Sequence, residues 1–394
     1  MGQSMLTLSG RVIRITEEQV DRQHVRAPRR QFSLSTNRNL PLPLRESRAY
    51  LSRSAEPAPG GFAHYFAFNS RPLSLADDLP CTLLGDEFSY LADGDVVSLT
   101  DDGRIRTLFR SASEHNSILL TEQCNNYCLM CSQPPKKVDD RWLLDEAMET
   151  VRLIPRNTRS LGITGGEPTL FGKGFLDLLH QIKNWLPRTS LHILSNGRTF
   201  SDVAFAEEYA AVQHPDVMIG IPVYSADPAR HDYVVQADGA FDETIRGILN
   251  LKRLNQKVEI RVVVHKQTYE GLPALAEFIA RNLLFVDHVA LMGLEMTGFT
   301  RANLDALWID PADYKAELSR AVRILRSYGL RTSVYNHQLC LVNPDVEPAY
   351  VKSISDWKNE YAPECEPCTR RAECGGFFSS GIQHGYSKSI RAFT

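Results

Sequence analysis

Strand and helix patterns alternate over the middle of the chain, from about residue 115 to 330. Short apolar runs predict strands at 117–121, 160–164, 190–194, 217–223, 258–265 and 287–294. Amphipathic segments predict helices near 142–153, 172–185, 202–211, 242–253, 271–282 and 311–327. Because a helix between two strands carries the chain back across the sheet, this order predicts parallel strands. We therefore expect an α/β fold, an open and partial (β/α)6 TIM-like barrel, with its chemistry at the carboxyl ends of the strands.

The regions on either side of this barrel differ from it. Residues 1–114 are rich in Pro, Gly and Arg and contain short alternating runs, which predicts a β-rich N-terminal domain. Residues 331–394 contain few long periodic segments but four of the eight cysteines, so this small domain is expected to need a metal to fold. The sequence therefore predicts three domains: 1–114, 115–330 and 331–394.

The N-terminal region carries a concentration of arginines. They are Arg22, Arg26, Arg29, Arg30, Arg38, Arg45, Arg48 and Arg53. One interpretation is a docking surface for an acidic peptide or protein, and the other is a solvated, loop-rich face. The sequence leaves both open.

Composition excludes several classes of protein. The formal charge is −3, which argues against nucleic-acid binding through bulk charge, and no apolar run has membrane-spanning length. The N-terminus MGQSMLTLSG lacks the pattern of a signal peptide, so we expect a cytoplasmic protein. In a reducing compartment, clustered cysteines bind metals more often than they form disulfides. Cys81 stands apart from the clusters and is predicted to be a buried core thiol.

Three cysteines share a loop directly after the first predicted strand: Cys124, Cys128 and Cys131, spaced Cys-x3-Cys-x2-Cys. Thiolates this close repel each other unless a metal neutralises them. A closed zinc site or an ordinary iron–sulfur cluster takes four protein ligands, so three leave one metal position open. The alternative is a three-cysteine zinc site completed by a histidine.

Polar residues also follow the second strand, end the third strand and lie within the fifth. Gly165, Gly166 and Glu167 follow the second strand; the glycines let backbone approach a ligand closely, and the glutamate adds negative charge. Ser195 and Asn196 end the third strand, where an Asn-Gly turn is the plain alternative. Arg261 lies within the fifth strand, either lining the barrel or pairing on its outer face with a helix carboxylate.

The tail contains a second cysteine group. Cys340 precedes Cys365, Cys368 and Cys374, so four thiolates are available to close a metal site. Four thiolates suit an iron–sulfur cluster, and they suit a structural zinc ion equally well.

Together, the three-cysteine loop and the Gly-Gly-Glu motif resemble those of the radical S-adenosylmethionine (SAM) superfamily. The resemblance implies a [4Fe–4S] cluster on Cys124, Cys128 and Cys131, whose open iron binds SAM and cleaves it to a 5′-deoxyadenosyl radical. It further implies that the Gly165–Glu167 motif binds the methionine amino group, that Ser195 or Asn196 contacts the ribose, and that Arg261 meets the carboxylate. The tail resembles SPASM or twitch domains, which implies an auxiliary [4Fe–4S] cluster on Cys340, Cys365, Cys368 and Cys374.

A narrower resemblance comes from the stretches TEQCNNYCLMCSQPPK and CEPCTRRAECGGFF and from His231-Asp232-Tyr233. These are similar to the His-Xaa-Ser system radical SAM maturases (HxsC). This resemblance implies a ribosomally made peptide or protein substrate with His-Xaa-Ser repeats, a second radical SAM enzyme, a small partner protein and an external electron donor. Two alternatives stay open: a radical SAM enzyme for a small molecule, and a non-catalytic zinc-binding interaction protein.

Overall fold

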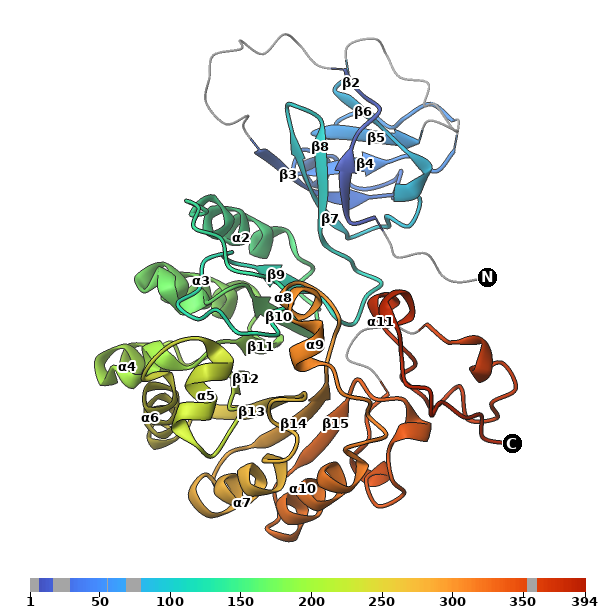
Figure 1. Cartoon of the computed structure of the whole chain (residues 1–394). Coiled ribbons are helices and arrows are strands. Elements are labelled where there is room, and N and C mark those ends of the chain that lie inside the picture. Colours follow the sequence, from blue (N-terminus) through green and yellow to red (C-terminus); the bar gives the residue numbers. More distant parts are fainter. Residues whose placement is uncertain (1–6, 17–28, 55, 69–78, 353–359) are drawn as a thin grey trace.

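The computed structural model describes residues 7–16, 29–54, 56–68, 79–352 and 360–394, and Figure 1 shows their arrangement. A β-rich N-terminal part, a central α/β part and a small cysteine-rich tail follow one another along the chain. This confirms the predicted fold class. Helices in the described ranges do not include one long and apolar enough to cross a membrane.

The central part is built on a seven-stranded sheet in the order β15-β14-β13-β12-β11-β10-β9, with every pair parallel. Its strands are β9 (Ser117–Leu119), β10 (Ser160–Thr164), β11 (Ser190–Leu194), β12 (Val217–Pro222), β13 (Lys257–Val264), β14 (His288–Gly293) and β15 (Thr332–Tyr335). All six predicted strands are present. The seventh, β15, was not predicted, because four residues with one fully buried side chain, Val334, give too short a pattern. It extends the sheet into residues predicted to belong to the tail.

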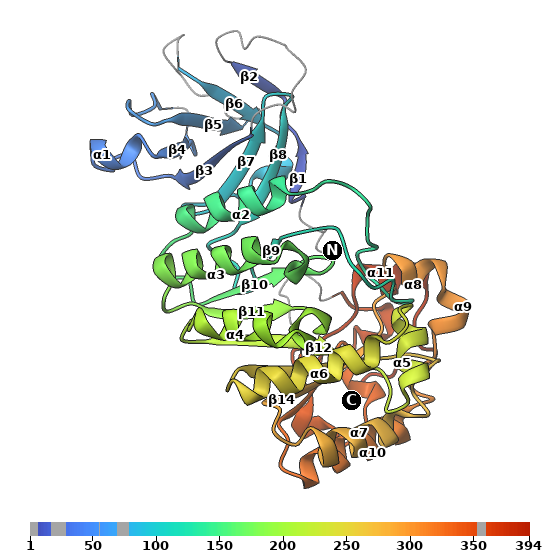
Figure 2. The same cartoon turned by 90° about the vertical axis from the view of Figure 1, so that its left-hand side faces the viewer.

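Helices cover one face of this sheet, which curves as an open, partial TIM-like barrel (Figures 1 and 2). They are α2 (Trp142–Leu153), α3 (Lys173–Trp185), α4 (Val203–Ala211), α6 (Ala240–Arg253), α7 (Leu272–Asn282) and α10 (Lys315–Ser327), close to the predicted ranges. Five short helices within the described ranges were not predicted: α1 (Leu42–Arg45), α5 (Pro228–Val235), α8 (Phe299–Ala302), α9 (Leu304–Leu307) and α11 (Ser379–His384). Single turns of 3-10 helix occupy Asp86–Phe88, Pro168–Phe171, Arg198–Ser201, Leu339–Leu341, Glu347–Ala349 and Pro363–Cys365.

The two faces of the sheet differ in chemistry, and β13 shows the difference most clearly. Val258, Ile260, Val262 and Val264 belong to the hydrophobic core shared with the helices. Since side chains alternate along a strand, Glu259 and its odd-numbered neighbours point to the opposite face, which we call the inner face. The inner face is therefore where charged groups enter the barrel.

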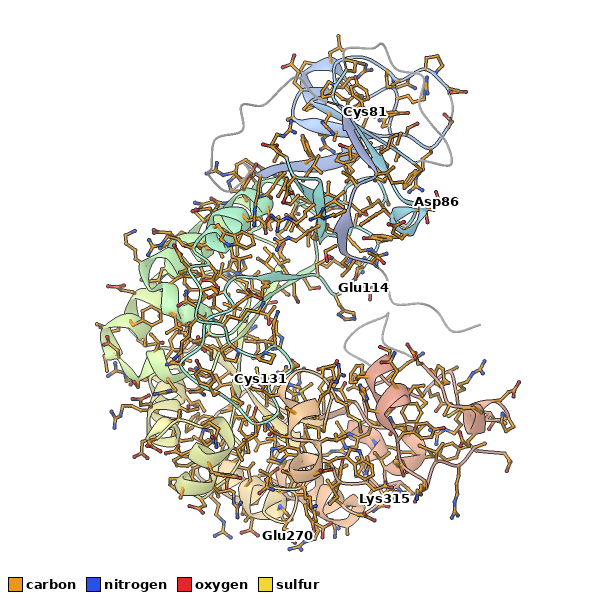
Figure 3. All side chains as sticks on the ribbon, turned by 45° about the horizontal axis from the view of Figure 1, so that its top comes forward. Cys81, Asp86, Glu114, Cys131, Glu270 and Lys315 are labelled. Atoms are coloured by element: carbon orange, nitrogen blue, oxygen red, sulfur yellow. The ribbon has the colours of Figure 1, made fainter. Side chains whose placement is uncertain are left out.

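The N-terminal part is a mixed eight-stranded sheet in the order β1-β8-β7-β3-β4-β5-β6-β2. Its strands are β1 (Ser9–Arg11), β2 (Arg14–Thr16), β3 (Arg29–Ser35), β4 (Arg48–Leu51), β5 (His64–Phe68), β6 (Cys81–Leu84), β7 (Val96–Thr100) and β8 (Arg104–Phe109), with helix α1 (Leu42–Arg45) between β3 and β4. Both end strands come from one segment: β1 pairs with β8, and two residues later β2 pairs with β6. This segment joins the two ends of the sheet and closes it into a small barrel. Cys81 is buried in this part, as predicted (Figure 3).

Several of the N-terminal arginines bond within the protein. The guanidinium of Arg45 donates to the carbonyl oxygens of Leu40 and Gly60 at 2.6 and 2.7 Å, and Arg53 donates to the carbonyl of Leu91. These arginines therefore hold loops of the β barrel together and do not form a purely solvated face. Arg22 and Arg26 lie outside the described residues.

One cluster of side chains joins the N-terminal part to the first helix of the central part. The guanidinium of Arg29 stacks 3.2 Å from the centre of the Trp142 ring, and Arg106 lies over the same ring at 5.1 Å. Both arginines also pair with the nearly buried carboxylate of Glu146. Gln31 donates to the backbone oxygen of Glu146 at 3.0 Å. Charge pairing and cation–π stacking thus connect the two parts.

Removing the Glu146 charge should loosen this connection. We expect Glu146→Gln to weaken it by about 2 kcal/mol, because two arginines lose their partner in a largely buried site. Limited proteolysis should then cut the connecting segment 110–116 faster. Glu277→Gln is the matched control, because its partner Arg281 is exposed on α7. Equal cleavage rates in the two variants would contradict this account of the interface.

A buried histidine makes the N-terminal part sensitive to acid. Burial, with a smaller effect from the charge of Arg30, lowers the pKa of His64 from 6.5 to about 3. Since the folded pKa lies below the unfolded one, His64 stabilises the fold above pH 6.5, and this contribution is lost as the pH falls toward 3. His64→Phe retains a ring against Phe32 but cannot titrate.

Because of His64, we expect the free energy of unfolding of the wild-type protein to decrease by about 3 kcal/mol between pH 7 and pH 4. Urea unfolding followed by circular dichroism at several pH values measures it. The His64→Phe variant should show a correspondingly shallower pH dependence, whereas His115→Phe, at an exposed position, should keep the wild-type slope. Identical slopes for His64→Phe and the wild type would exclude His64 as the source.

Candidate cysteine-cluster site

The three-cysteine loop leaves β9 at the carboxyl edge of the sheet and is held from two sides. On one side, the amides of Gly166 and Glu167 donate to the carbonyls of Thr121 and Gln123, each at 2.8 Å. On the other side, the amide of Tyr127 donates to the carbonyl of Val235 at 3.0 Å. Strand pairing therefore continues beyond β9 and β10 into the loop and fixes the backbone on which the cysteines stand.

The thiol groups of this loop lie close enough to influence one another. Burial, with smaller effects from the charges of Glu167 and Cys131, raises the pKa of Cys124 to about 11. Burial, followed by the charges of Cys131 and Cys124, also raises the pKa of Cys128. The backbone amide of Asn126 donates to the Cys124 sulfur at 3.4 Å. Three half-buried thiols with an amide donor suit a bound metal cluster, which supplies the positive charge that three thiolates require.

The third cysteine is fixed from the far side of the sheet. The amide of Phe299, at the start of α8, donates to the carbonyl of Cys131 at 2.8 Å, and Thr300 donates to that of Met130 at 3.1 Å. Met130 itself is buried against Tyr224 and Leu307. The segment after β14 therefore closes over the loop, and Figure 3 labels Cys131 there.

Gly165 and Gly166 are required by the cysteine loop itself. A Cβ atom on Gly165 would lie 2.5 Å from the carbonyl oxygen of Thr121, and Gly165 has a φ of +155°. A Cβ atom on Gly166 would overlap the carbonyl oxygen of Gln123 and lie 3.1 Å from Cβ of Cys124. The sequence predicted close backbone approach to a ligand. In the structure, the neighbour that the glycines admit is the backbone of the cluster loop.

Glu167 is fully buried, and its carboxylate bonds within the protein. It accepts hydrogen bonds from the amide and hydroxyl of Thr169 at 3.1 and 2.6 Å, from the hydroxyl of Ser195 at 2.9 Å, and from the amide of Asn196 at 2.6 Å. Burial nevertheless raises the pKa of Glu167. The carboxylate thus ties the turn after β10 to the turn after β11.

Asn196 carries this connection to the cysteine loop. The side-chain amide nitrogen of Asn196, Nδ2, donates to Oδ1 of Asn125 at 2.6 Å and lies 4.0 Å from the sulfur of Cys124. Arg198, two residues later, donates to the Asn125 carbonyl at 2.7 Å. The structure therefore brings together Gly165, Gly166, Glu167, Ser195 and Asn196 around Cys124.

Arg261 points to the inner face of the sheet and not toward the helices. Its guanidinium donates to Glu259 at 2.7 Å and to the sulfur of Met292 at 3.1 Å. Its side chain crosses Gly220 of β12, where an added Cβ would lie 2.8 Å from the Arg261 Cδ atom. The outer-face alternative is therefore wrong, because the residue lines the barrel.

The sequence analysis did not predict a group of polar side chains next to Arg261, which we call the polar row: Glu259, His192, His288 and Ser333. Glu259 accepts a hydrogen bond from His288 at 2.6 Å and faces His192 at 3.3 Å, and His288 also bonds Ser333 at 2.9 Å. Burial alone would raise the pKa of Glu259, but the hydrogen bonds of His192 and His288 and the charge of Arg261 lower it overall. The available signal was Glu259 itself, a carboxylate two residues from Arg261 and so on the same face of one strand.

The four tail cysteines, Cys340, Cys365, Cys368 and Cys374, line one small pocket. Backbone amides point at their sulfurs: Leu339 and Gly376 donate to Cys374 at 3.3 and 3.4 Å, and Phe393 donates to Cys368 at 3.4 Å. Amide donors of this kind suit thiolates that bind a metal cluster. The described ranges contain no group of three or more Cys, His, Asp or Glu side chains arranged to bind a single metal ion. An iron–sulfur cluster has a different requirement, because each thiolate binds a different iron atom.

Residues 118–279 match the family model of the radical SAM superfamily. No curated protein sequence matches the chain. Among solved structures, SuiB from Streptococcus suis bound to S-adenosylmethionine has 18% identity and a TM-score of 0.45, over 56% of this chain and 50% of SuiB. The AdoMet-bound anSMEcpe has 18% identity and a TM-score of 0.42, over 55% of this chain and 62% of anSMEcpe.

A radical SAM methyltransferase from Sphaerobacter thermophilus has 14% identity and a TM-score of 0.40, over 61% of this chain and 72% of that protein. The chain thus spans about half the length of SuiB. The family match itself begins in β9, contains the three-cysteine loop and the Gly-Gly-Glu motif, and ends within α7. Residues 118–279 of this protein form a radical SAM superfamily domain.

Proposed function

We propose that this protein is a radical SAM enzyme that modifies a ribosomally made peptide or protein. The observation that carries the proposal is the half-buried three-thiol loop at the carboxyl edge of the sheet, inside the matched domain. When bound at Cys124, Cys128 and Cys131, a [4Fe–4S] cluster with SAM supplies a 5′-deoxyadenosyl radical that abstracts hydrogen from substrate.

The surrounding residues hold and orient the cosubstrate in this proposal. The Gly165–Gly166 backbone and the side chain of Asn196 border Cys124. Glu167 fixes the position of Asn196 through its amide, so we assign it a positioning role. Arg261 offers a guanidinium on the inner face to the carboxylate of SAM, held there by Glu259. Ser195 completes the turn against Glu167.

The flanking parts serve the peptide in this proposal. Residues 1–114 form a docking domain, residues 115–330 together with β15 form the radical SAM barrel, and the rest of 331–394 forms an auxiliary-cluster domain on Cys340, Cys365, Cys368 and Cys374. The resemblance to the HxsC maturases supports a His-Xaa-Ser type of substrate, with a second radical enzyme and a small protein as partners. An external electron donor supplies the reducing electron.

Anaerobic reconstitution tests the proposal. We expect roughly eight irons per chain, and release of 5′-deoxyadenosine when dithionite and SAM are added. Cys128→Ala should abolish that release and leave about four irons, whereas Cys365→Ala should lose the other four and leave the SAM-binding cluster. Absence of 5′-deoxyadenosine from the fully loaded protein would sink the enzymatic assignment. Retention of zinc in place of iron at the tail would overturn the auxiliary cluster alone.

A further inference from the structure

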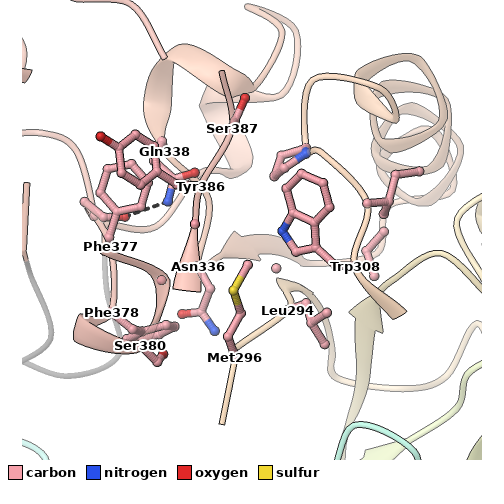
Figure 4. Close-up of a pocket in the computed structure, with 18 of the residues that line it drawn as sticks. Leu294, Met296, Trp308, Asn336, Gln338, Phe377, Phe378, Ser380, Tyr386 and Ser387 are labelled. Carbon is pink, nitrogen blue, oxygen red and sulfur yellow. Dashed lines mark hydrogen bonds between the residues drawn. The ribbon is translucent and has the colours of Figure 1, made fainter. Parts of the chain in front are cut away.

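The four-cysteine pocket of the tail has one wall built from residues close to its cysteines. The side-chain amide of Gln338 donates to the carbonyl oxygen of Gly376 at 2.9 Å (Figure 4, dashed line). The backbone amides of Leu339 and Gly376 donate to the sulfur of Cys374 at 3.3 and 3.4 Å. This wall is local, since each of these residues lies within two positions of a cysteine.

A second wall comes from residues 391–393, which we call the strap. Arg391 and Phe393 line the same pocket as the four cysteines. The backbone amide of Phe393 donates to the sulfur of Cys368 at 3.4 Å. Burial raises the pKa of Cys340, and a hydrogen bond from the backbone of Arg391 acts against that rise. The strap therefore reaches both the isolated cysteine and the later group of three.

Phe393 is fixed beside Cys368 by its carbonyl and its ring as well as by its amide. The carbonyl oxygen accepts hydrogen bonds from the amide and the hydroxyl of Thr369 at 2.9 and 3.0 Å. The centre of the ring lies 5.0 Å from the guanidinium carbon of Arg370. Glu347 binds that guanidinium through two hydrogen bonds of 3.1 and 3.0 Å. The position of the strap is thus set by the residues that directly follow Cys368.

This arrangement suits a segment that supports a metal site. Amides that donate to thiolates stabilise the negative charge that builds up when thiolates converge. Removing a group that orients a metal ligand typically lowers metal affinity by about 10–100-fold, and the apolar groups around a site limit the access of solvent. Phe393 supplies both kinds of support, since its amide faces a thiolate and its partly buried ring packs against the main hydrophobic core.

We propose that the strap positions the ligands of the tail cluster and shields the cluster from solvent. The backbone amides of Arg391 and Phe393 orient Cys340 and Cys368, and the Phe393 ring covers the site. Arg391 and Phe393 are positioning residues, because they act through the cysteines. The inference rests on the auxiliary cluster of the proposed function and adds residues 391–393 to that site.

The Cys128→Ala background isolates the tail site, because it is expected to retain only the tail's irons, about four per chain. In this background, Phe393→Pro lacks both the ring and the amide N–H, whereas Phe393→Ala lacks only the ring. We expect an iron chelator to remove iron about tenfold faster from Phe393→Pro than from the Cys128→Ala parent, with Phe393→Ala in between. Redox titration followed by EPR should give Phe393→Pro a lower midpoint potential than Phe393→Ala, since the amide stabilises the more negative, reduced cluster.

Phe285→Ala, at an aromatic position that is 45% exposed, is the control and should lose iron at the rate of the parent. Arg370→Met leaves the strap sequence intact and removes the cation beside the Phe393 ring. It should speed iron loss about threefold, which keeps the proposal testable if Phe393→Pro does not fold.

Equal midpoint potentials in Phe393→Pro and Phe393→Ala would overturn the proposal, and so would parental rates of iron loss in every strap variant. Zinc in place of iron at the tail would overturn it as well. Because iron loss requires no turnover, the expected strap effects without 5′-deoxyadenosine release by the wild type would sink the enzymatic assignment alone. Release of 5′-deoxyadenosine without any strap effect would sink the strap alone.

Discussion

Gly166→Ala should cost the protein its first cluster while leaving the second in place. The added methyl group would overlap the carbonyl oxygen of Gln123 and press on Cβ of Cys124. Neither neighbour can move freely, because Gln123 is bonded to the amide of Glu167 and Cys124 is anchored through Asn126. The loop must therefore shift, and three thiols that no longer converge bind iron poorly.

We expect the reconstituted Gly166→Ala variant to retain roughly four of eight irons and, like Cys128→Ala, to lose the release of 5′-deoxyadenosine. Iron analysis and the release assay measure the two effects. Gly271→Ala, at the start of α7, is the matched control, because the nearest atom to its added Cβ is 3.6 Å away. If Gly166→Ala bound as much iron as the wild type, the added methyl group would not displace the cysteine loop, and the prediction would be wrong.

The second large effect concerns the buried pair of Glu259 and Arg261. Their side chains are 8% and 18% exposed, and they are joined at 2.7 Å. We expect Glu259→Gln to destabilise the fold by about 3–5 kcal/mol, because it removes the negative charge that Arg261 faces and replaces one of the two acceptor oxygens with an NH2 donor in a buried site. The double variant Glu259→Gln/Arg261→Met should cost less than the sum of the two single variants, with a coupling energy of about 1–3 kcal/mol.

Urea unfolding of the four proteins measures this coupling. The same cycle at Glu207 and Arg253, whose side chains are 58% and 56% exposed, should give about 0–1 kcal/mol. Because the pKa of Glu259 is held below its unfolded value, the stabilisation exists above about pH 4.5 and disappears in acid, so the wild type and Glu259→Gln should converge there. A coupling energy no larger than that of the exposed pair would contradict the claim that Glu259 and Arg261 stabilise each other in a buried site.

The central strands and helices could be predicted because each is long enough to show a clear hydrophobic pattern. Six strands and six helices lie close to their predicted ranges, since a buried parallel strand is apolar along its length and its covering helix repeats every three to four residues. Elements such as β15, α8 and α9 were missed for the opposite reason. Each has four residues and is held by contacts with distant parts of the chain, such as the bond between Phe299 and Cys131.

The candidate site shows the same division residue by residue. The identities of Cys124, Cys128 and Cys131 and the presence of Gly165–Glu167 were evident from spacing alone. The use made of Glu167 was not, because its four hydrogen bonds come from Thr169, Ser195 and Asn196, and two of these residues follow a different strand. The sequence identifies the Glu167 carboxylate, but only the folded structure shows that its hydrogen bonds are made within the protein.

The sequence by itself determined the radical SAM domain, its parallel sheet and the three-cysteine loop, because these depend on local spacing and on residue chemistry. Only the tertiary structure decided the rest. It turned Arg261 inward onto Glu259, closed the N-terminal sheet through one bent segment, and folded the tail back so that Trp308 faces Phe377. Each of these arrangements joins residues far apart in the chain, and such contacts are fixed by packing and by the pairing of buried polar groups, which no local pattern records.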